Sequence, residues 1–159
     1  MMFLRICEKH GNASLHHFSK DGKLLRTVGG PGNKPGEFRL PHSLWIDDNG
    51  LVWVADRDNY RIEVFDGQGD LVKCFDPIYP YNIPYGLSTL WGNEQYVFCS
   101  QDSRGIVVYD VKELNFVGFI AAPNGSPILG HSLCGDSEGS LYTGNLHPDP
   151  MVTKLIRIQ

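Results

Sequence analysis

Short runs of apolar residues, or runs in which apolar and polar residues alternate, recur along the whole chain. They include residues 43–46, 51–55, 61–65 and 71–75, and turns that contain glycine separate them. A period of two and short apolar runs bounded by turns are typical of β-strands. No window combines a sustained helical period with helix caps, so we predict an all-β chain with very little helix.

The strand pattern is itself repeated. Residues 41–56 (PHSLWIDDNGLVWVAD) align without a gap with residues 130–145 (GHSLCGDSEGSLYTGN), at an offset of 89 residues (131 − 42). Residues 84–87, 96–99 and 106–110 form a copy between them, and a partial copy begins at residue 12. A unit of about 45 residues with four short strands predicts a β-propeller blade, whose first strand lines the central channel.

The number of blades that fit the chain is small. We expect the last strands of one blade at about 3–28, blades at about 41–76 and 84–121, and most of a last blade at 130–159. Residues 1–159 would then form a single partial propeller domain of about three and a half blades, whereas closed propellers have about four to eight. An open ring exposes two sheet edges. We expect a second copy of the chain, or a missing propeller half, to cover them.

Composition and charge narrow the classes of partner. The 159 residues are 42% hydrophobic and 20% charged, which is typical of a globular domain. The formal net charge is −4 and there is no basic run, so we expect no nucleic-acid partner. No stretch reaches the roughly 18 apolar residues of a membrane span, and residues 1–7 are too short for the apolar region of a signal peptide. The cysteines lack metal-site spacing, so we expect free, mostly buried thiols rather than two disulfides at Cys7, Cys74, Cys99 and Cys134.

Three segments carry a family resemblance, namely residues 17–25 (HFSKDGKLL), 35–44 (PGEFRLPHSL) and 54–62 (VADRDNYRI). They resemble NHL-repeat proteins. Within that group the chain looks most like the C-terminal half of the peptidyl-α-hydroxyglycine α-amidating lyase family and its relatives. The resemblance extends through residues 84–87 to the last blade and implies a six-bladed propeller, in a family whose members are often secreted.

The resemblance also implies a zinc site. In the lyases, three histidines from alternate blades hold a catalytic zinc in the channel, and His42 and His131 correspond to the second and third of them. Both residues begin equivalent inner strands, so we expect both to face the channel axis, where neutral imidazoles can bind zinc. In the structural alternative, each imidazole donates a hydrogen bond to a neighbouring strand carbonyl.

Arg57 matches an active-site arginine of the lyases. Its planar guanidinium could bind a substrate carboxylate through two hydrogen bonds. The alternative is an ordinary inter-blade ion-pair network of Arg57 and Arg61 with Asp56 and Asp58, in which exposed pairs would stabilise the fold only weakly.

Three further positions affect the functional hypothesis. His10 stands where the lyases have a tyrosine, and it could act as a general base because histidine titrates near neutral pH. Ser132 replaces an acidic residue that follows the third zinc histidine, which argues against the associated calcium site. Tyr85 takes the place of His42 in the intervening blade, where it either reaches a channel ligand or simply lines the channel.

Two functional hypotheses follow. The first is a propeller that binds a peptide or protein partner as a scaffold, without catalysis. The alternative is a zinc-dependent lyase that releases glyoxylate from a hydroxyglycine-extended peptide, with Arg57 and His10 as catalytic residues.

Overall fold

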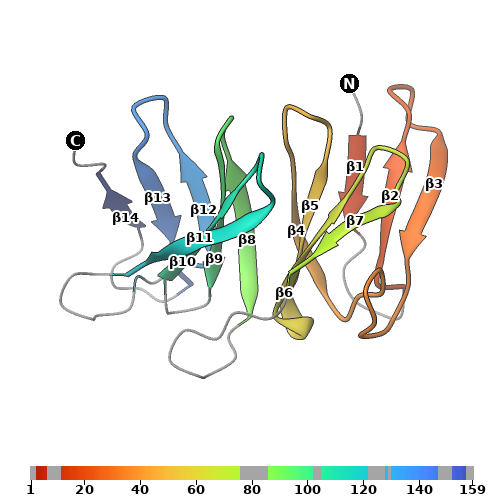
Figure 1. The fold of residues 1–159 in the computed structure, drawn as a ribbon, viewed down its shortest axis with the longest axis horizontal. Helices are drawn as coiled ribbons and strands as arrows, with labels where there is room; N and C mark the ends of the chain where they lie inside the picture. The colour runs from red at the N-terminus through yellow and green to blue at the C-terminus, as the bar shows by residue number, and fades with distance from the viewer. Residues whose placement is uncertain are drawn as a thin grey trace.

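The computed structural model describes residues 3–6, 12–75, 86–101, 105–121, 128, 130–146 and 152–156. In that part of the chain the strands form four antiparallel sheets, numbered I to IV here, and the short 3-10 helix η1 (Arg57–Asn59) connects the second and third strands of sheet II (Figure 1). Their strands are β1 (Phe3–Ile6), β2 (Ser14–Phe18) and β3 (Leu24–Gly29) in sheet I; β4 (Pro41–Ile46), β5 (Val52–Asp56), β6 (Arg61–Phe65) and β7 (Leu71–Cys74) in sheet II; β8 (Leu87–Gly92), β9 (Tyr96–Gln101), β10 (Gly105–Asp110) and β11 (Asn115–Ile120) in sheet III; and β12 (Ser132–Gly135), β13 (Leu141–Gly144) and β14 (Val152–Leu155) in sheet IV.

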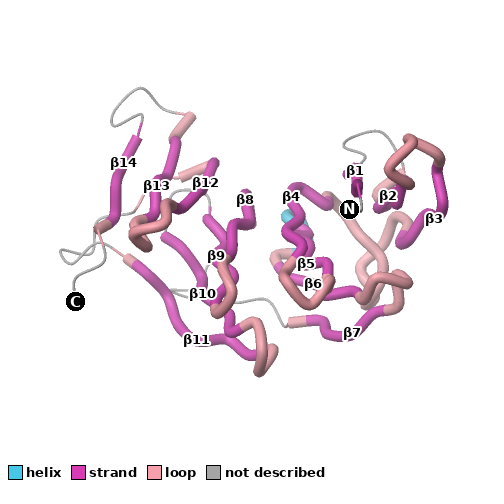
Figure 2. Tube along the Cα trace, turned by 90° about the horizontal axis from the view of Figure 1, so that it is seen from above, coloured by secondary structure: helices cyan, strands magenta, loops and turns pink. Residues whose placement is uncertain are grey.

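The four sheets stand side by side in an arc. Viewed along the strands, β4, β8 and β12 lie on the inner side of the arc, and β7 and β11 lie on its outer side (Figure 2). Within each sheet the strands follow chain order, so each is a simple meander. This arrangement confirms the all-β partial propeller that the sequence repeat predicted.

The hairpin turns of sheets II and IV are built in the same way. One carboxylate oxygen of Asp47 accepts the N–H groups of Asn49 and Leu51, and Asp136 in the equivalent turn accepts those of Glu138 and Ser140. Gly50 and Gly139 take φ values of 80° and 82°, which glycine adopts without steric cost. The other oxygen of each aspartate binds an aromatic side chain of the next strand, at 2.9 Å for Trp53 Nε1 and 2.8 Å for Tyr142 Oη.

Apolar side chains from both neighbours fill the space between adjacent sheets. Between sheets II and III, the ring centroid of Phe75 lies 5.8 Å from that of Trp53 and 4.6 Å from that of Tyr109. Between sheets III and IV, Trp91 and Phe98 pack beside the buried residues Ile106, Leu133 and Leu141. Each such buried side chain contributes about 1.5–3 kcal/mol, so these contacts hold the sheets together.

A buried ionic network holds the segment before β4 against sheet II. Arg61 Nη2 lies 2.5 Å from Glu63 Oε1, and Arg61 Nε lies 3.5 Å from Asp56 Oδ2. The same guanidinium donates hydrogen bonds of 2.7–2.8 Å to the carbonyls of Asn33, Lys34 and Glu37. The expectation of exposed pairs was therefore wrong for Arg61, because residues 33–37 return over the sheet and bury its ion pairs.

The structure corrects the predicted burial of the cysteines. Cys99 is buried, but Cys74 is only half-buried and Cys134 is exposed; all three are free, and Cys7 lies outside the described residues. Cys134 is exposed because it takes the position of Trp45 in sheet IV, on the face that points away from sheet III. Within the described residues, no helix is long and apolar enough to cross a membrane.

Candidate functional site

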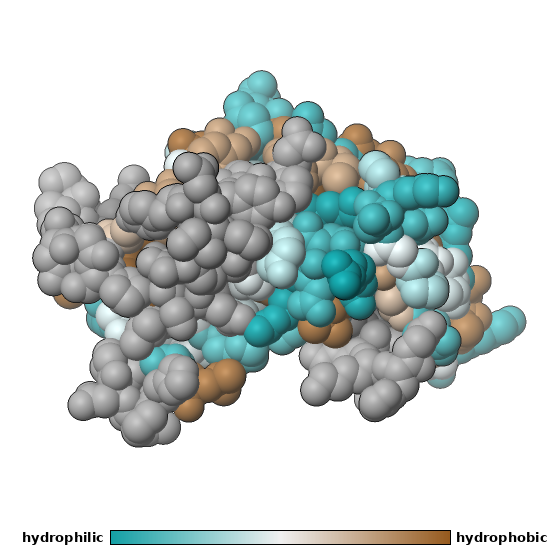
Figure 3. Space-filling model, turned by 90° about the horizontal axis from the view of Figure 1, so that it is seen from below, coloured by the Kyte–Doolittle hydropathy of each residue, from teal (hydrophilic) through white to brown (hydrophobic). Residues whose placement is uncertain are grey.

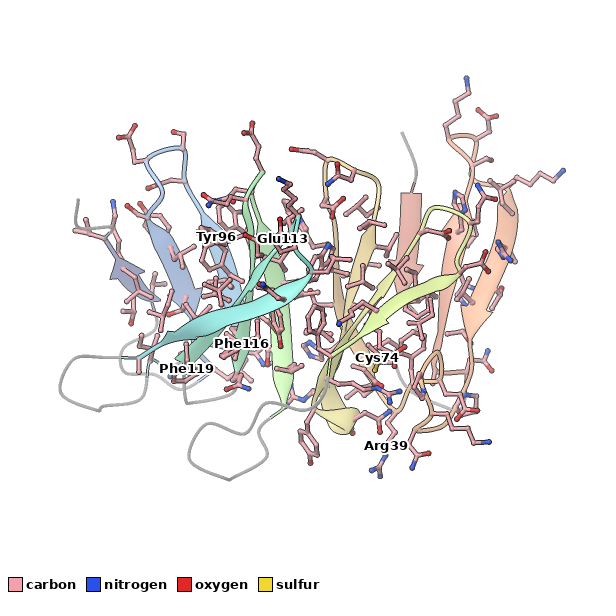
Figure 4. The ribbon with its side chains drawn as sticks, viewed as in Figure 1. Arg39, Cys74, Tyr96, Glu113, Phe116 and Phe119 are labelled. Atoms are coloured by element: carbon pink, nitrogen blue, oxygen red, sulfur yellow. The ribbon has the colours of Figure 1, made fainter. Side chains whose placement is uncertain are left out.

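The candidate residues gather at one end of the sheets, where β4 and β12 begin and where η1 follows β5 (Figure 1). Seen from this end, the described surface near the centre is mostly hydrophilic (Figure 3). Arg39 is exposed and extends from the same end of the molecule (Figure 4). The inner strands thus present polar groups here, whereas their middle parts are packed between the sheets.

Two β-bulges shape the inner strands at this end. The register between β4 and β5 shifts between Pro41 and Ser43, so His42 is the extra residue of a bulge. The register between β8 and β9 shifts between Leu87 and Leu90. A bulge bends its strand and redirects a side chain, and bulges are common beside functional sites. The first bulge is therefore the local cause of the direction of the His42 side chain.

His42 and His131 lie side by side although they are two repeats apart. Their ring centroids are 5.1 Å apart and the rings are nearly perpendicular, at 86°. His42 Nδ1 lies 2.8 Å from the carbonyl oxygen of Ser88. Because a carbonyl only accepts hydrogen bonds, Nδ1 carries the proton and donates it. In the neutral imidazole this leaves the Nε2 lone pair available to a proton donor or a metal ion.

Strand β8 ties the strands of the two histidines together. Thr89 Oγ1 donates to the carbonyl of His131 at 2.8 Å, and the backbone N–H of Leu90 donates to Ser43 Oγ at 3.0 Å. These bonds connect β8 to the start of β12 on one side and to β4 on the other. They fix the spacing of the inner strands, and with it the distance between the two imidazoles.

Arg57 reaches the same group of residues from η1. Its Nη1 lies 3.4 Å from Ser88 Oγ, its Nε lies 4.0 Å from Asp58 Oδ1, and a quarter of its side chain is exposed. Its backbone N–H donates to the carbonyl of Leu40 at 2.8 Å, which anchors η1 beside the start of β4. Ser88 therefore contacts His42 through its carbonyl and Arg57 through its hydroxyl.

Comparison with known proteins identifies the repeat that carries this site. Residues 38–65 match the family model of the NHL repeat. The chain contains an NHL repeat. It is 46% identical over 116 residues to NHL repeat-containing protein 3 of Mus musculus, a match that covers 72% of this chain and 30% of the relative. It is also 35% identical over 63 residues to the probable peptidyl-alpha-hydroxyglycine alpha-amidating lyase pgal-1 of Caenorhabditis elegans, covering 38% of this chain and 18% of that protein.

A solved structure supports the fold alone. The WD40 repeats of RRP9 superpose with a TM-score of 0.66 at 15% identity, covering 92% of this chain and 46% of that chain. In each of these comparisons the chain spans less than half of the other protein. The propeller fold of the NHL-repeat chain is therefore established, while the activities of the whole relatives remain proposals for it.

The NHL repeat holds two of the predicted site residues, His42 and Arg57, and His131 joins them from sheet IV. His10 and Tyr85 lie outside the described residues, so their predicted roles stay predictions. Sequence reasoning missed Ser88, which is fully buried. The available signal was the pair Ser88-Thr89 between the apolar residues of an inner strand, where a buried hydroxyl needs a hydrogen-bond partner.

The two imidazoles alone would make only part of a metal site. Among the described residues, no group of three or more His, Cys, Asp or Glu side chains is placed to hold a metal ion. His42 and His131 offer two nitrogens, and the bond from His42 Nδ1 to a backbone carbonyl is the outer contact that metal-binding histidines commonly make. The pair fits zinc as two ligands of a larger set.

The NHL repeat also contains two buried carboxyl groups, Asp56 and Glu63. Burial raises the pKa of Glu63 to about 7, against the opposing effects of the Gly36 N–H and of Arg61. Burial also raises the pKa of Asp56, which is opposed by bonds from Asn59 and from the backbone of Leu40 and Arg39. Both acids are engaged in holding the segment before β4, so we assign them a structural role.

Proposed function

We propose that this NHL-repeat chain binds a peptide or protein segment at the end of the sheets that carries His42, His131 and Arg57. The observation that carries the proposal is that these side chains meet beside β8: His42 and Arg57 of sheet II both contact Ser88, and the His131 ring, next to sheet IV, lies 5.1 Å from that of His42. Hydrogen bonds between the sheets, rather than mobile side chains alone, hold the group in place. A preorganised polar group at the exposed end of a propeller suits recognition of an extended ligand.

The chemistry of the group suits a ligand with a carboxylate. Arg57 presents a planar guanidinium that can bind both oxygens of a carboxylate. The neutral imidazole of His42 has an Nε2 lone pair that can accept an N–H or O–H from the ligand. A peptide backbone with an acidic side chain or a terminal carboxylate supplies both kinds of group.

A peptide selection tests the binding proposal. A phage-displayed library of random peptides is selected on the intact chain, and the enriched peptides are titrated by calorimetry. We expect acidic peptides whose affinity falls about tenfold for Arg57→Ala, because a buried charge-assisted bond is lost. Arg26→Ala, an equal charge change on the exposed strand β3, serves as the control and should bind normally. Enriched peptides that bind both variants equally well would refute the assignment of this surface.

A specific observation favours a second candidate, a zinc-dependent lyase. The protonated Nδ1 of His42 leaves Nε2 available beside His131, and the lyase pgal-1 is among the relatives. His42 and His131 would hold the zinc together with a further ligand, and Arg57 would hold the carboxylate of a hydroxyglycine-extended peptide. Zinc, when bound, supplies Lewis-acid polarisation of a ligand oxygen.

Elemental analysis separates the two candidates. Protein purified without chelator or affinity metal is analysed for zinc, next to the double variant His42→Ala, His131→Ala. Stoichiometric zinc that the double variant lacks, together with release of glyoxylate from a peptidyl-α-hydroxyglycine, would support the lyase. A zinc-free native chain that binds its selected peptide would leave the binding module as the function.

A further inference from the structure

The segment between β3 and β4, residues 30–40 (GPGNKPGEFRL), is held in place although it is rich in glycine and proline. Pro31 and Phe38 form an isolated parallel bridge. The N–H of Gly32 donates to the carbonyl of Phe38, and the N–H of Phe38 donates to the carbonyl of Gly30. The Phe38 side chain is fully buried in the core between sheets I and II. This segment, termed the 30–40 loop, is therefore closed at its base and anchored to the sheets.

Three buried ionic side chains of sheet II also bind the backbone of the 30–40 loop. Arg61 donates to three of its carbonyls, and Glu63 accepts one of its N–H groups at 2.7 Å. Asp56 Oδ1 accepts the N–H groups of Arg39 and Leu40, at 3.0 and 3.1 Å. A buried ion pair adds little net stability over apolar side chains of similar volume. What this network supplies is the fixed shape of a loop at the surface.

The fixed loop presents an arginine beside an open hollow. The hollow has a volume of about 470 Å³ and is lined by Pro31, Gly32, Asn33, Phe38 and Arg39. Arg39 is the charged residue among these, and its side chain is exposed and extends from the end of the molecule that carries the histidine pair (Figure 4). All five residues lie between sheets I and II, which are both described, so the hollow does not depend on where the chain begins or ends.

Hydrogen bonds connect the 30–40 loop to the segment that carries Arg57. The N–H of Arg57 donates to the carbonyl of Leu40, the neighbour of Arg39, at 2.8 Å. Asn59, two residues after Arg57, donates from Nδ2 to the carbonyl of Gly32 at 3.0 Å. Each residue of an extended peptide spans about 3.3 Å. A short peptide segment that reaches Arg57 can therefore continue over the 30–40 loop to Arg39.

The acidic side chains near these arginines have partners of their own. Asp58 Oδ1 lies 4.0 Å from Arg57 Nε, and Glu37 Oε2 accepts the N–H of Lys34 at 3.1 Å. Among the described residues, no carboxylate forms an ion pair with Arg39. Its planar guanidinium can bind both oxygens of a carboxylate supplied by a ligand.

We propose that Arg39 is a second anion-binding residue of the site, and that it takes a second acidic side chain of the peptide whose first carboxylate binds Arg57. This inference rests on the function proposed above and specifies its ligand, which is a peptide segment with two acidic groups. The buried network beneath the loop keeps the backbone of Arg39 in position before the ligand arrives. Less conformational freedom is then lost on binding.

Double-mutant cycles between the protein and its selected peptides test this inference. The probes are the acidic peptides that the phage selection enriches on the intact chain, with each Asp or Glu replaced in turn by Asn or Gln, titrated in about 0.15 M salt. We expect the loss of one acidic group to weaken binding to the native chain about tenfold, but binding to Arg39→Ala by less than about twofold. A different acidic group should be coupled to Arg57 in the same way. Independent, additive effects of Arg39→Ala at every acidic position would overturn the inference.

A charge exchange gives an independent measurement. Arg39→Glu should bind the parent peptide at least about tenfold more weakly, and a peptide with Lys at the coupled position should recover most of that loss. Lys34→Glu is the matched control, because Lys34 is an exposed cation of the same loop that does not line the hollow. It should bind the parent peptide within about threefold of the native chain, since salt screens exposed charges. An equal loss in both variants would show a general effect of charge and would overturn the assignment of Arg39.

The same measurements separate this inference from the function on which it rests. The Arg39 variants should keep the native midpoint of urea unfolding, because Asp56 binds the backbone N–H of Arg39 and not its side chain. Weak binding by Arg57→Ala with full binding by Arg39→Ala would overturn the second contact and leave the proposed function intact. Full binding by both variants would overturn the proposed function as well.

Discussion

Two buried carboxyl groups, those of Asp56 and Glu63, lie next to the guanidinium of Arg61. Among the described residues, Arg61 is the cation that forms ion pairs with them, and replacing it by methionine removes that positive charge. The guanidinium has an exposed side-chain fraction of 8%, and the side chains of Asp56 and Glu63 are fully buried. Methionine fills much of the same volume but donates no hydrogen bond. The carbonyls of residues 33, 34 and 37 would therefore also lose the bonds that now hold them.

The expected cost follows from these contacts. Breaking a buried ion pair by removing one partner costs about 3–5 kcal/mol, because the remaining charge stays desolvated. We therefore expect Arg61→Met to lower the free energy of unfolding by about 4 kcal/mol, a large part of the roughly 5–15 kcal/mol of a typical domain. The loss should be greatest at pH 8, where Glu63 is ionised, and smaller at pH 5.

Urea unfolding followed by tryptophan fluorescence measures this cost, and Arg26→Met on the exposed strand β3 is the control. The double variant Arg61→Met, Glu63→Gln should recover part of the loss, because the glutamine side chain carries no charge into the interior. Hydrogen exchange at Gly36, whose N–H donates to Glu63 Oε2 at 2.7 Å, should become faster in Arg61→Met. A loss below about 1 kcal/mol at pH 8 would refute the reading of this network as buried and structural.

A turn, the aromatic core and the buried acid each respond to one substitution. Gly50→Ala should lower the free energy of unfolding in urea by about 1 kcal/mol, because φ is 80° at this position. Gly67→Ala is the control and should lower it less, because Gly67 has no positive φ and no heavy atom near the added Cβ. Equal losses for the two variants would contradict this prediction. Trp53→Phe should lower stability by about 2 kcal/mol in thermal unfolding, since it loses the bond to Asp47 and leaves a cavity; an unchanged midpoint would count against it. Because the pKa of Glu63 is about 7 in the folded chain against 4.5 ordinarily, folding takes up a proton, so stability should fall as pH rises from about 4.5 to 7, and Glu63→Gln should remove that slope.

The repeat made the architecture predictable. Sheets II and IV carry the same turn aspartate, Asp47 or Asp136, and Asn93 takes its place in sheet III, so the strands and their order follow from alignment of the chain with itself. Trp45, Trp53 and Trp91 pack between the sheets, because large apolar side chains at equivalent strand positions have nowhere else to be buried. Local pattern and global packing agree in these elements, which is the condition under which sequence reasoning succeeds.

The ionic network could not be predicted, because its partners are distant in sequence. Arg61 and Asp56 belong to one conspicuous charged motif, which gave no sign that residues 33–37 would cover it. Glu63 looked like an ordinary polar residue of an alternating strand. Only the return of the segment before β4 over sheet II turns these side chains inward, and propensity and periodicity carry no information about such a contact.

The sequence repeat predicted the positions of the two histidines in their strands, but not the distance between them. Equivalence of His42 and His131 placed both at the start of inner strands, yet equivalence alone sets no distance between positions two sheets apart. That distance depends on what lies between, and here it is β8, whose Ser88 and Thr89 bind the two histidine positions from either side. The intervening repeat has no histidine in its described part. Its strand β8 nevertheless sets the geometry of the site, because it holds the strands of His42 and His131 in place. The ring centroids of the two histidines are 5.1 Å apart, which is close enough for one ligand to contact both.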